Sequence, residues 1–109
     1  MDRLKKHGIE EEMARRLVRQ FHPDKIILFG SHARGTAGPD SDIDLLIVMA
    51  VKGSKRSKTV EMYRLLGGMG MSKDIIVVTP EEIQRYKKIP GTIVYQALNE
   101  GKLLYERAA

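Results

Sequence analysis

Two hydrophobic periods alternate along this chain and predict its helices and strands. Apolar residues at every fourth position, Ile9, Met13 and Leu17, give residues 8–20 one apolar face, which predicts an amphipathic helix. Short, almost continuous apolar runs predict buried strands at residues 25–30, 42–49 and 73–78. The middle run is apolar on both faces after Asp44, which is typical of a central strand covered on both sides.

Turn and capping residues divide the second half of the chain into further elements. Helices are expected at residues 59–66, 79–88 and 91–101, and a short edge strand at residues 102–106. Thr79 and Glu82 have the spacing of a capping box at the start of the second helix. This order of elements predicts an α/β or α+β fold, with helices packed on a small mixed β-sheet. A chain of 109 residues suits one domain, expected to span residues 1–109.

Composition narrows the classes of function. The chain has no cysteine, which excludes disulfides and thiolate metal sites and is typical of a reducing cytosol, so a cytoplasmic location is expected. No apolar run is long enough to span a membrane, and the first residues lack the apolar stretch of a secretory signal. The net charge of +5 suits an anionic partner such as a nucleotide, RNA or an acidic protein, but a solvated basic surface explains it equally well.

The segment Asp42-Ile43-Asp44 at the start of the middle strand is the first candidate site. Residues i and i+2 of a strand point to the same face, roughly 6.6 Å apart, so both carboxylates can bind one ion or a close pair of ions. Oxygen ligands favour Mg²⁺ or Mn²⁺ over Zn²⁺. Asp74 opens the next strand and would supply a third carboxylate if the two strands are neighbours. A capped, solvated turn is the alternative, because aspartate and serine are ordinary turn residues.

The stretch GSHARG, residues 30–35, follows the first strand directly and is the second candidate site. Gly30 would let a phosphate oxygen approach the backbone, and Ser31 could donate its hydroxyl to the same group. Arg34 would either contact the phosphate or pair with an acidic neighbour. His32 has no evident role, and a surface position is expected for it.

The two candidate sites together form a narrow pattern: a Gly-Ser pair, ten residues, then Asp-x-Asp between two strands. The stretch GSHARGTAGPDSDIDLLIV, residues 30–48, resembles the signature of the DNA polymerase beta-type nucleotidyltransferase superfamily. The whole chain resembles its minimal branch, MNT, over roughly residues 9–106, including the later KDIIVVTPEEI and ALNEGKLLYE. The resemblance implies a palm-like nucleotidyltransferase core.

The resemblance also implies roles for the candidate residues. Gly30 and Ser31 would hold the triphosphate. Asp42, Asp44 and Asp74 would be catalytic and would bind two Mg²⁺ ions, and Asp74 could also deprotonate the acceptor hydroxyl. The reaction would be a two-metal transfer of a nucleoside monophosphate, AMP from ATP before other nucleotides, with release of pyrophosphate (an EC 2.7.7-type activity).

A protein partner is implied as well. The usual partner of the minimal branch is a small helical HEPN protein, often a ribonuclease toxin, which the nucleotidyltransferase neutralises as an antitoxin and in some cases AMPylates on a tyrosine. Two candidate contact surfaces are TIVYQAL, residues 92–98 of the last helix, and a basic loop expected at residues 52–58. Core packing and solvation are the alternatives for these two segments.

Two other functions remain open. A catalytically weak antitoxin could act by occluding its partner, or a transferase could act on RNA or on a small molecule such as an aminoglycoside. RNA is not favoured, because the chain has no tryptophan and only 6% aromatic residues on which bases could stack. Since the catalytic core would take up almost the whole chain, self-association or a separate partner would have to supply the acceptor surface.

Overall fold

The structure, a computed structural model, describes residues 2–108 and the side chains of residues 8–108. Its elements are, in order, α1 (Asp2–Phe21), β1 (Lys25–Phe29), α2 (Ser31–Arg34), β2 (Ile43–Val48), α3 (Lys55–Leu66), β3 (Lys73–Val78), α4 (Pro80–Tyr86), α5 (Ile93–Glu100) and β4 (Lys102–Glu106). The strands form one sheet in the order β3-β2-β1-β4, in which β2 and β3 are parallel and the other pairs antiparallel. The predicted small mixed sheet with packed helices is therefore confirmed.

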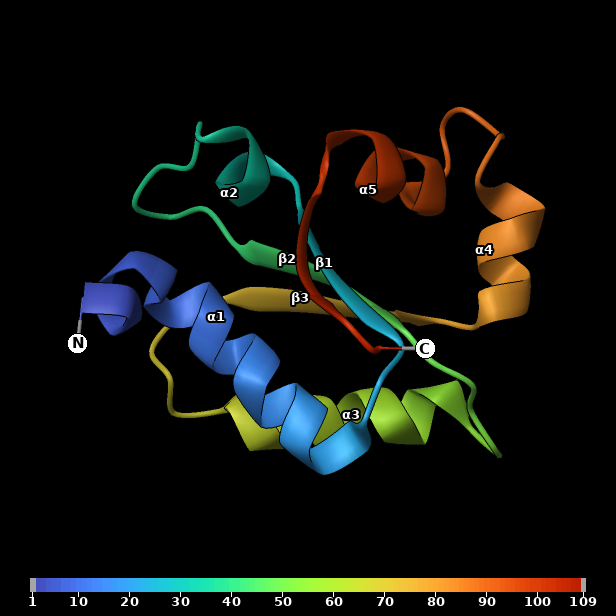
Figure 1. The fold of residues 1–109 in the computed structure, drawn as a ribbon, viewed down its shortest axis with the longest axis horizontal. Helices are drawn as coiled ribbons and strands as arrows, with labels where there is room; N and C mark the ends of the chain where they lie inside the picture. The colour runs from blue at the N-terminus through green and yellow to red at the C-terminus, as the bar shows by residue number, and fades with distance from the viewer. Residues whose placement is uncertain (1, 109) are drawn as a thin grey trace.

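Helices cover both faces of this sheet (Figure 1). On one face, Met13 and Leu17 of α1 and Met62 of α3 are fully buried in a core with alternate side chains of β1, β2 and β3. On the other face, Val94 and Ala97 of α5 form a second core with the remaining strand side chains. No helix within residues 2–108 is long and apolar enough to cross a membrane. β2 lies inside the sheet and is buried on both faces after its second residue, as its sequence predicted.

Two element boundaries differ from the prediction. α1 extends N-terminal to the predicted helix at residues 8–20, but it is kinked at Gly8, whose φ of 65° and ψ of −164° are not helical. The basic segment expected as a loop at residues 52–58 is helical from Lys55 onward, so that part of the prediction was wrong. The reason is local, because the Ser54 hydroxyl accepts a hydrogen bond from the Ser57 N–H at 3.1 Å and so caps α3 one turn early.

The strand directions bring three chain segments to one end of the sheet. Because β1 runs antiparallel to β2 and β2 runs parallel to β3, the end of β1 lies beside the beginnings of β2 and β3. The register pairs Phe29 with Asp44, and Asp44 with Asp74. Gly30 and α2 follow β1 at this same end. The glycine-serine turn and the aspartates, separate candidates in the sequence, therefore meet at one corner of the sheet.

Candidate functional site

Asp44 and Asp74 lie opposite each other on neighbouring parallel strands. Side chains alternate along a strand, so Asp44 shares a face with Leu46, which packs in the core beneath α5. Registered residues of parallel strands point the same way, and Asp74 is therefore on this face too. Asp44 is half-buried and Asp74 is exposed. The strand order thus brings the third predicted carboxylate beside the second, which the sequence expected but could not derive.

Gly30 lies so close to Asp44 that no side chain fits between them. Its φ of 73° is in the left-handed region, where residues other than glycine are strained. In addition, a Cβ atom at this position would collide with Oδ2 of Asp44. The backbone conformation therefore favours glycine at this position, and any larger residue would also have to displace the Asp44 carboxylate. The glycine-serine turn and the Asp44 carboxylate consequently form one continuous surface.

Among the side chains of residues 8–108, no salt bridge to a lysine or arginine joins Asp42, Asp44 or Asp74. Burial, together with the neighbouring carboxylates of Asp74 and Asp42, raises the pKa of Asp44 above its ordinary value, and His32 opposes this effect. The motif arginine does not relieve the crowding, because Arg34 pairs with Glu100 of α5 at 3.4 Å. A ligand that brings positive charge would therefore be stabilised beside Asp44 and Asp74.

These carboxylates fit a magnesium ion that arrives with phosphate groups. Asp42 lies just before β2 and is exposed, and within residues 8–108 no three His, Asp or Glu side chains gather closely enough to hold an ion on their own. Mg²⁺ usually takes only one or two protein carboxylates and completes its shell with water and substrate phosphates. Asp44 and Asp74 match that donor set. The predicted binding of two ions by Asp42, Asp44 and Asp74 stays a prediction.

The predicted nucleotide-binding residues lie beside the carboxylates on α2. Ser31 is the first residue of this helix and is half-buried, whereas Arg34 at its end is exposed. The ion pair of Arg34 with Glu100 confirms the acidic neighbour that the sequence left open. With both side chains almost half exposed, such a pair contributes little stability, so it does not prevent Arg34 from turning toward a phosphate.

His32 is a residue whose role the sequence did not indicate. Only 13% of its side chain is exposed, so the expected surface position is wrong. Its Nε2 lies 3.3 Å from the Ser41 carbonyl oxygen and its Nδ1 lies 3.3 Å from Oε2 of Glu10. These partners are distant along the chain, so no local motif could have revealed them; only the fold brings α1, α2 and the start of β2 together.

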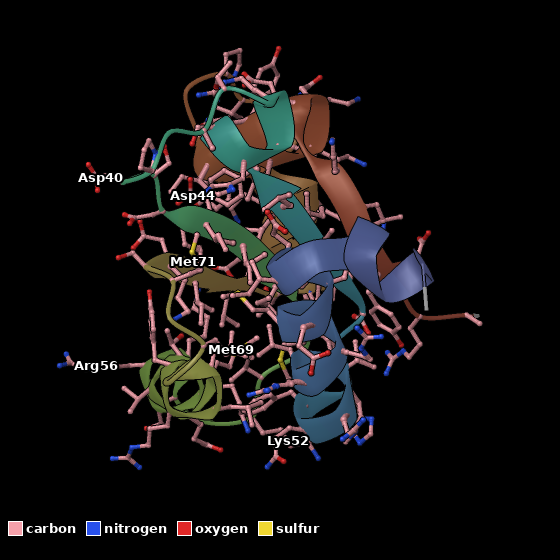
Figure 2. The ribbon with its side chains drawn as sticks, turned by 90° about the vertical axis from the view of Figure 1, so that its left-hand side faces the viewer. Asp40, Asp44, Lys52, Arg56, Met69 and Met71 are labelled. Atoms are coloured by element: carbon pink, nitrogen blue, oxygen red, sulfur yellow. The ribbon has the colours of Figure 1, made fainter. Side chains whose placement is uncertain are left out.

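Figure 2 shows how the labelled side chains are distributed around the site. Asp40 projects from the loop before β2, and Asp44 lies inward of that loop, toward α2. Lys52 and Arg56, from the basic segment considered as a contact surface, extend from the distant end of the molecule that carries α3. On α5, Ile93 and Leu98 are exposed while Val94 and Ala97 pack against the sheet, so this helix both builds the core and presents apolar surface.

Comparison with known proteins assigns this chain to a family. The family described as "Polymerase beta, Nucleotidyltransferase" matches residues 11–109. This chain belongs to that nucleotidyltransferase family. Two proteins of Methanocaldococcus jannaschii are similar to it. "Putative protein adenylyltransferase MJ0604" is 38% identical over 74% of this chain and 77% of the relative. "Putative protein adenylyltransferase MJ1305" is 29% identical over 98% of this chain and 76% of the relative.

Solved nucleotidyltransferase structures have the same fold. A chain in a crystal structure of a toxin–antitoxin with AMP-PNP superimposes with a TM-score of 0.64 at 22% identity, over 91% of this chain and 75% of that one. A chain in the structure of a tri-AMPylated Shewanella oneidensis HEPN toxin in complex with MNT antitoxin gives a TM-score of 0.56 at 20% identity, over 89% and 70%. The minimal nucleotidyltransferase fold inferred from the motif is thereby confirmed.

Proposed function

We propose that this nucleotidyltransferase is a magnesium-dependent adenylyltransferase that moves AMP from ATP to a protein hydroxyl, and that the acceptor is a HEPN-type toxin. The single observation that carries the proposal is the corner where Gly30 touches the Asp44 carboxylate and Asp44 faces Asp74. It combines backbone that a triphosphate can approach with carboxylates that favour a divalent cation.

Each residue of the corner has a part in the proposed reaction. Gly30 and Ser31 hold the triphosphate, and Arg34 can add a charge-assisted contact. Asp44, with Asp74 and Asp42, holds magnesium, which when bound would neutralise phosphate charge and stabilise the attacking and leaving oxygens.

The proposed reaction is a displacement at the α-phosphorus of ATP. The acceptor oxygen attacks the α-phosphorus of ATP, and a new P–O bond forms. The bond between this phosphorus and the oxygen that bridges to the β-phosphorus breaks, so pyrophosphate leaves with that electron pair. The acceptor proton passes to a carboxylate, for which exposed Asp74 is placed at the rim of the site.

The relatives and the exposed apolar residues of α5 support a protein as the acceptor. Two similar proteins are named as protein adenylyltransferases, and a structure of the same fold contains an AMPylated HEPN toxin. The exposed Ile93 and Leu98 of α5 offer apolar surface to a protein acceptor. The last residue of α5, Glu100, pairs with Arg34, so the C-terminal end of this helix lies beside α2, whereas Leu98 lines a hollow with Lys25 and Val48 at the opposite end of the sheet.

The test is transfer of label from ATP labelled at the α-phosphate, in the presence of Mg²⁺, to a HEPN-type protein from the same genome. We expect label on the partner with the wild type and with Asp40→Asn, which removes an exposed carboxylate of the same loop. Asp44→Asn should lose the label. Toxin neutralisation that persists in Asp44→Asn, without any labelling by the wild type, would contradict the proposal and favour an antitoxin that acts by occlusion.

A further inference from the structure

His32 joins three segments that are distant in the sequence. Its ring lies between the carboxylate of Glu10 on α1 and the backbone carbonyl of Ser41, which is the residue directly before Asp42. Both contacts are 3.3 Å long. The side chains of His32 and Glu10 are only 13% and 24% exposed, so solvent competes weakly for these contacts. Both neighbours are hydrogen-bond acceptors, so the tautomer of the ring decides which of them receives the N–H, and the ring lies half-buried between the two.

Within the part of the chain whose side chains are described, residues 8–108, the loop that precedes β2 makes few other hydrogen bonds to distant residues. Residues 35–40 are exposed, and their backbone hydrogen bonds are short-range, such as that from the Ser41 N–H to the Gly38 carbonyl at 3.2 Å. From Ile43 onward the chain is fixed, because its N–H donates to Ser72 at 2.9 Å and β2 pairs on both sides. Asp42 lies between the exposed loop and the fixed strand. Its position therefore depends on how firmly Ser41 is held.

We propose that His32 is a positioning residue which, oriented by Glu10, fixes the Ser41 carbonyl and thereby holds Asp42 beside Asp44 for binding a divalent cation with a triphosphate. This inference rests on the proposed function of the same site. His32 touches neither the substrate nor the reacting atoms; it acts through the backbone. Residues that orient metal ligands in this indirect way commonly change metal affinity by about tenfold or more when they are replaced.

The chemistry of the ring indicates which substitutions separate its two contacts. Glutamine at position 32 carries an N–H donor at about the reach of Nε2 and can still bond to the Ser41 carbonyl. The shorter asparagine side chain reaches only as far as Nδ1. It therefore keeps an N–H donor for Glu10 but loses the contact with the Ser41 carbonyl. Glu10→Gln keeps an acceptor for the ring without the charge, whereas Glu10→Ala removes the acceptor. His22→Asn is a matched control, because His22 is exposed and lies at the opposite end of β1 from the site.

The experiment measures the dissociation constant of Mn²⁺ in the presence of a non-hydrolysable ATP analogue, from the spin-resonance signal of free Mn²⁺, and the melting temperature of each variant. We expect His32→Asn and Glu10→Ala to weaken Mn²⁺ binding by about tenfold, while each still melts cooperatively. His32→Gln and Glu10→Gln should recover most of the affinity, and His22→Asn should bind as the wild type does. This rescue by glutamine separates positioning from a general loss of packing.

Two results would overturn the inference, and they are distinguishable. If Asp44→Asn loses Mn²⁺ binding while His32→Asn and Glu10→Ala bind normally, His32 does not position the ligands, but the proposed function stands. If Asp44→Asn also binds Mn²⁺ as the wild type does, the metal site itself is wrong, and both proposals fail. Should His32→Asn not fold, the pair Glu10→Ala and Glu10→Gln decides the question on the same measurement.

Discussion

The two ends of β3 place carboxylates in opposite electrostatic settings. At its beginning Asp74 faces Asp44, and the pKa of Asp44 is raised by burial and by the neighbouring carboxylates. Beyond its end, Glu82 accepts hydrogen bonds from Lys55 Nζ at 2.8 Å and from the Thr79 N–H at 2.9 Å, and these contacts lower its pKa. The same kind of side chain is stabilised in one place and crowded in the other.

We propose that this difference separates a structural carboxylate, Glu82, from a functional one, Asp44. Glu82 belongs to a complete capping box at the start of α4, where a negative charge also favours the helix N-terminus. Asp44 has no lysine or arginine partner within residues 8–108, and Gly30 allows the turn to press against it. Local arrangements that reduce stability are typical of functional sites, where the missing interaction is supplied by a ligand.

Replacing one carboxylate at each end of β3 should therefore give opposite phenotypes, and this is the largest effect we expect. Asp74→Asn should reduce AMP transfer by about 10²-fold or more, because a charge aimed at the reacting groups is lost. It should leave the fold intact, since Asp74 is exposed. Glu82→Gln should keep full activity. Single-turnover rates with labelled ATP measure both, and comparable activity in the two variants would contradict the assignment of Asp74.

Gly30→Ala should be the most destabilising single substitution at the site. The added Cβ meets the Asp44 carboxylate, and the alanine residue has to adopt a φ of 73°. The free energy of unfolding should therefore fall by about 2 kcal/mol. Gly38→Ala is the matched control in the same segment, because a Cβ there meets nothing within 4 Å and the φ is not positive. Urea unfolding compares the two, and equal stability of the variants would show that Gly30 is not in contact with Asp44.

Glu82 should make the free energy of unfolding depend on pH. Its pKa is lowered in the folded state from the ordinary 4.5, so its contribution to stability is complete above that value and disappears as the pH falls through the folded-state pKa. At neutral pH, Glu82→Gln should lower the free energy of unfolding by about 0.5 kcal/mol through loss of the Lys55 pair. The difference from wild type should vanish in acid. Glu81→Gln, which removes the exposed neighbouring carboxylate, is the control in the same denaturation series.

The smallest expected effect concerns the support of β3. The Tyr63 hydroxyl on α3 accepts a hydrogen bond from the Ile75 N–H at 2.8 Å, next to Asp74 on an edge strand. Tyr63→Phe should therefore cost about 1 kcal/mol or less of unfolding free energy and change activity little. Tyr95→Phe serves as a control, since the Tyr95 hydroxyl makes no hydrogen bond within residues 8–108. A large loss of activity in Tyr63→Phe alone would indicate that the position of β3 limits catalysis.

The sequence predicted local structure well where neighbouring residues decide it. The Thr79–Glu82 capping box, the apolar run after Asp44 and the edge strand at residues 102–106 follow from spacing and residue type, and the structure contains all three. The early start of α3 was missed because the cap formed by Ser54 outweighs the polar composition of the segment.

The site depends on contacts that the sequence could not determine. The pairing of Asp44 with Asp74 follows from strand order, and one chain without its fold does not reveal which strands are neighbours. The contact between Gly30 and Asp44 likewise joins the end of one strand to the start of another. His32 was judged a surface residue because its partners Glu10 and Ser41 are brought to it by tertiary structure.

The measurement that tests the central claim most directly is the melting temperature of the wild type and Asp44→Asn at neutral pH, first without metal and then with Mg²⁺ and a non-hydrolysable ATP analogue. A carboxyl whose pKa is raised by folding destabilises the folded state once it is ionised, so Asp44→Asn should be the more stable protein without metal. With Mg²⁺ and the analogue, which bind only the folded wild type tightly, the order should reverse. If the wild type is the more stable protein without metal, or gains no more than Asp44→Asn from the ligands, Asp44 is not the centre of a metal–nucleotide site.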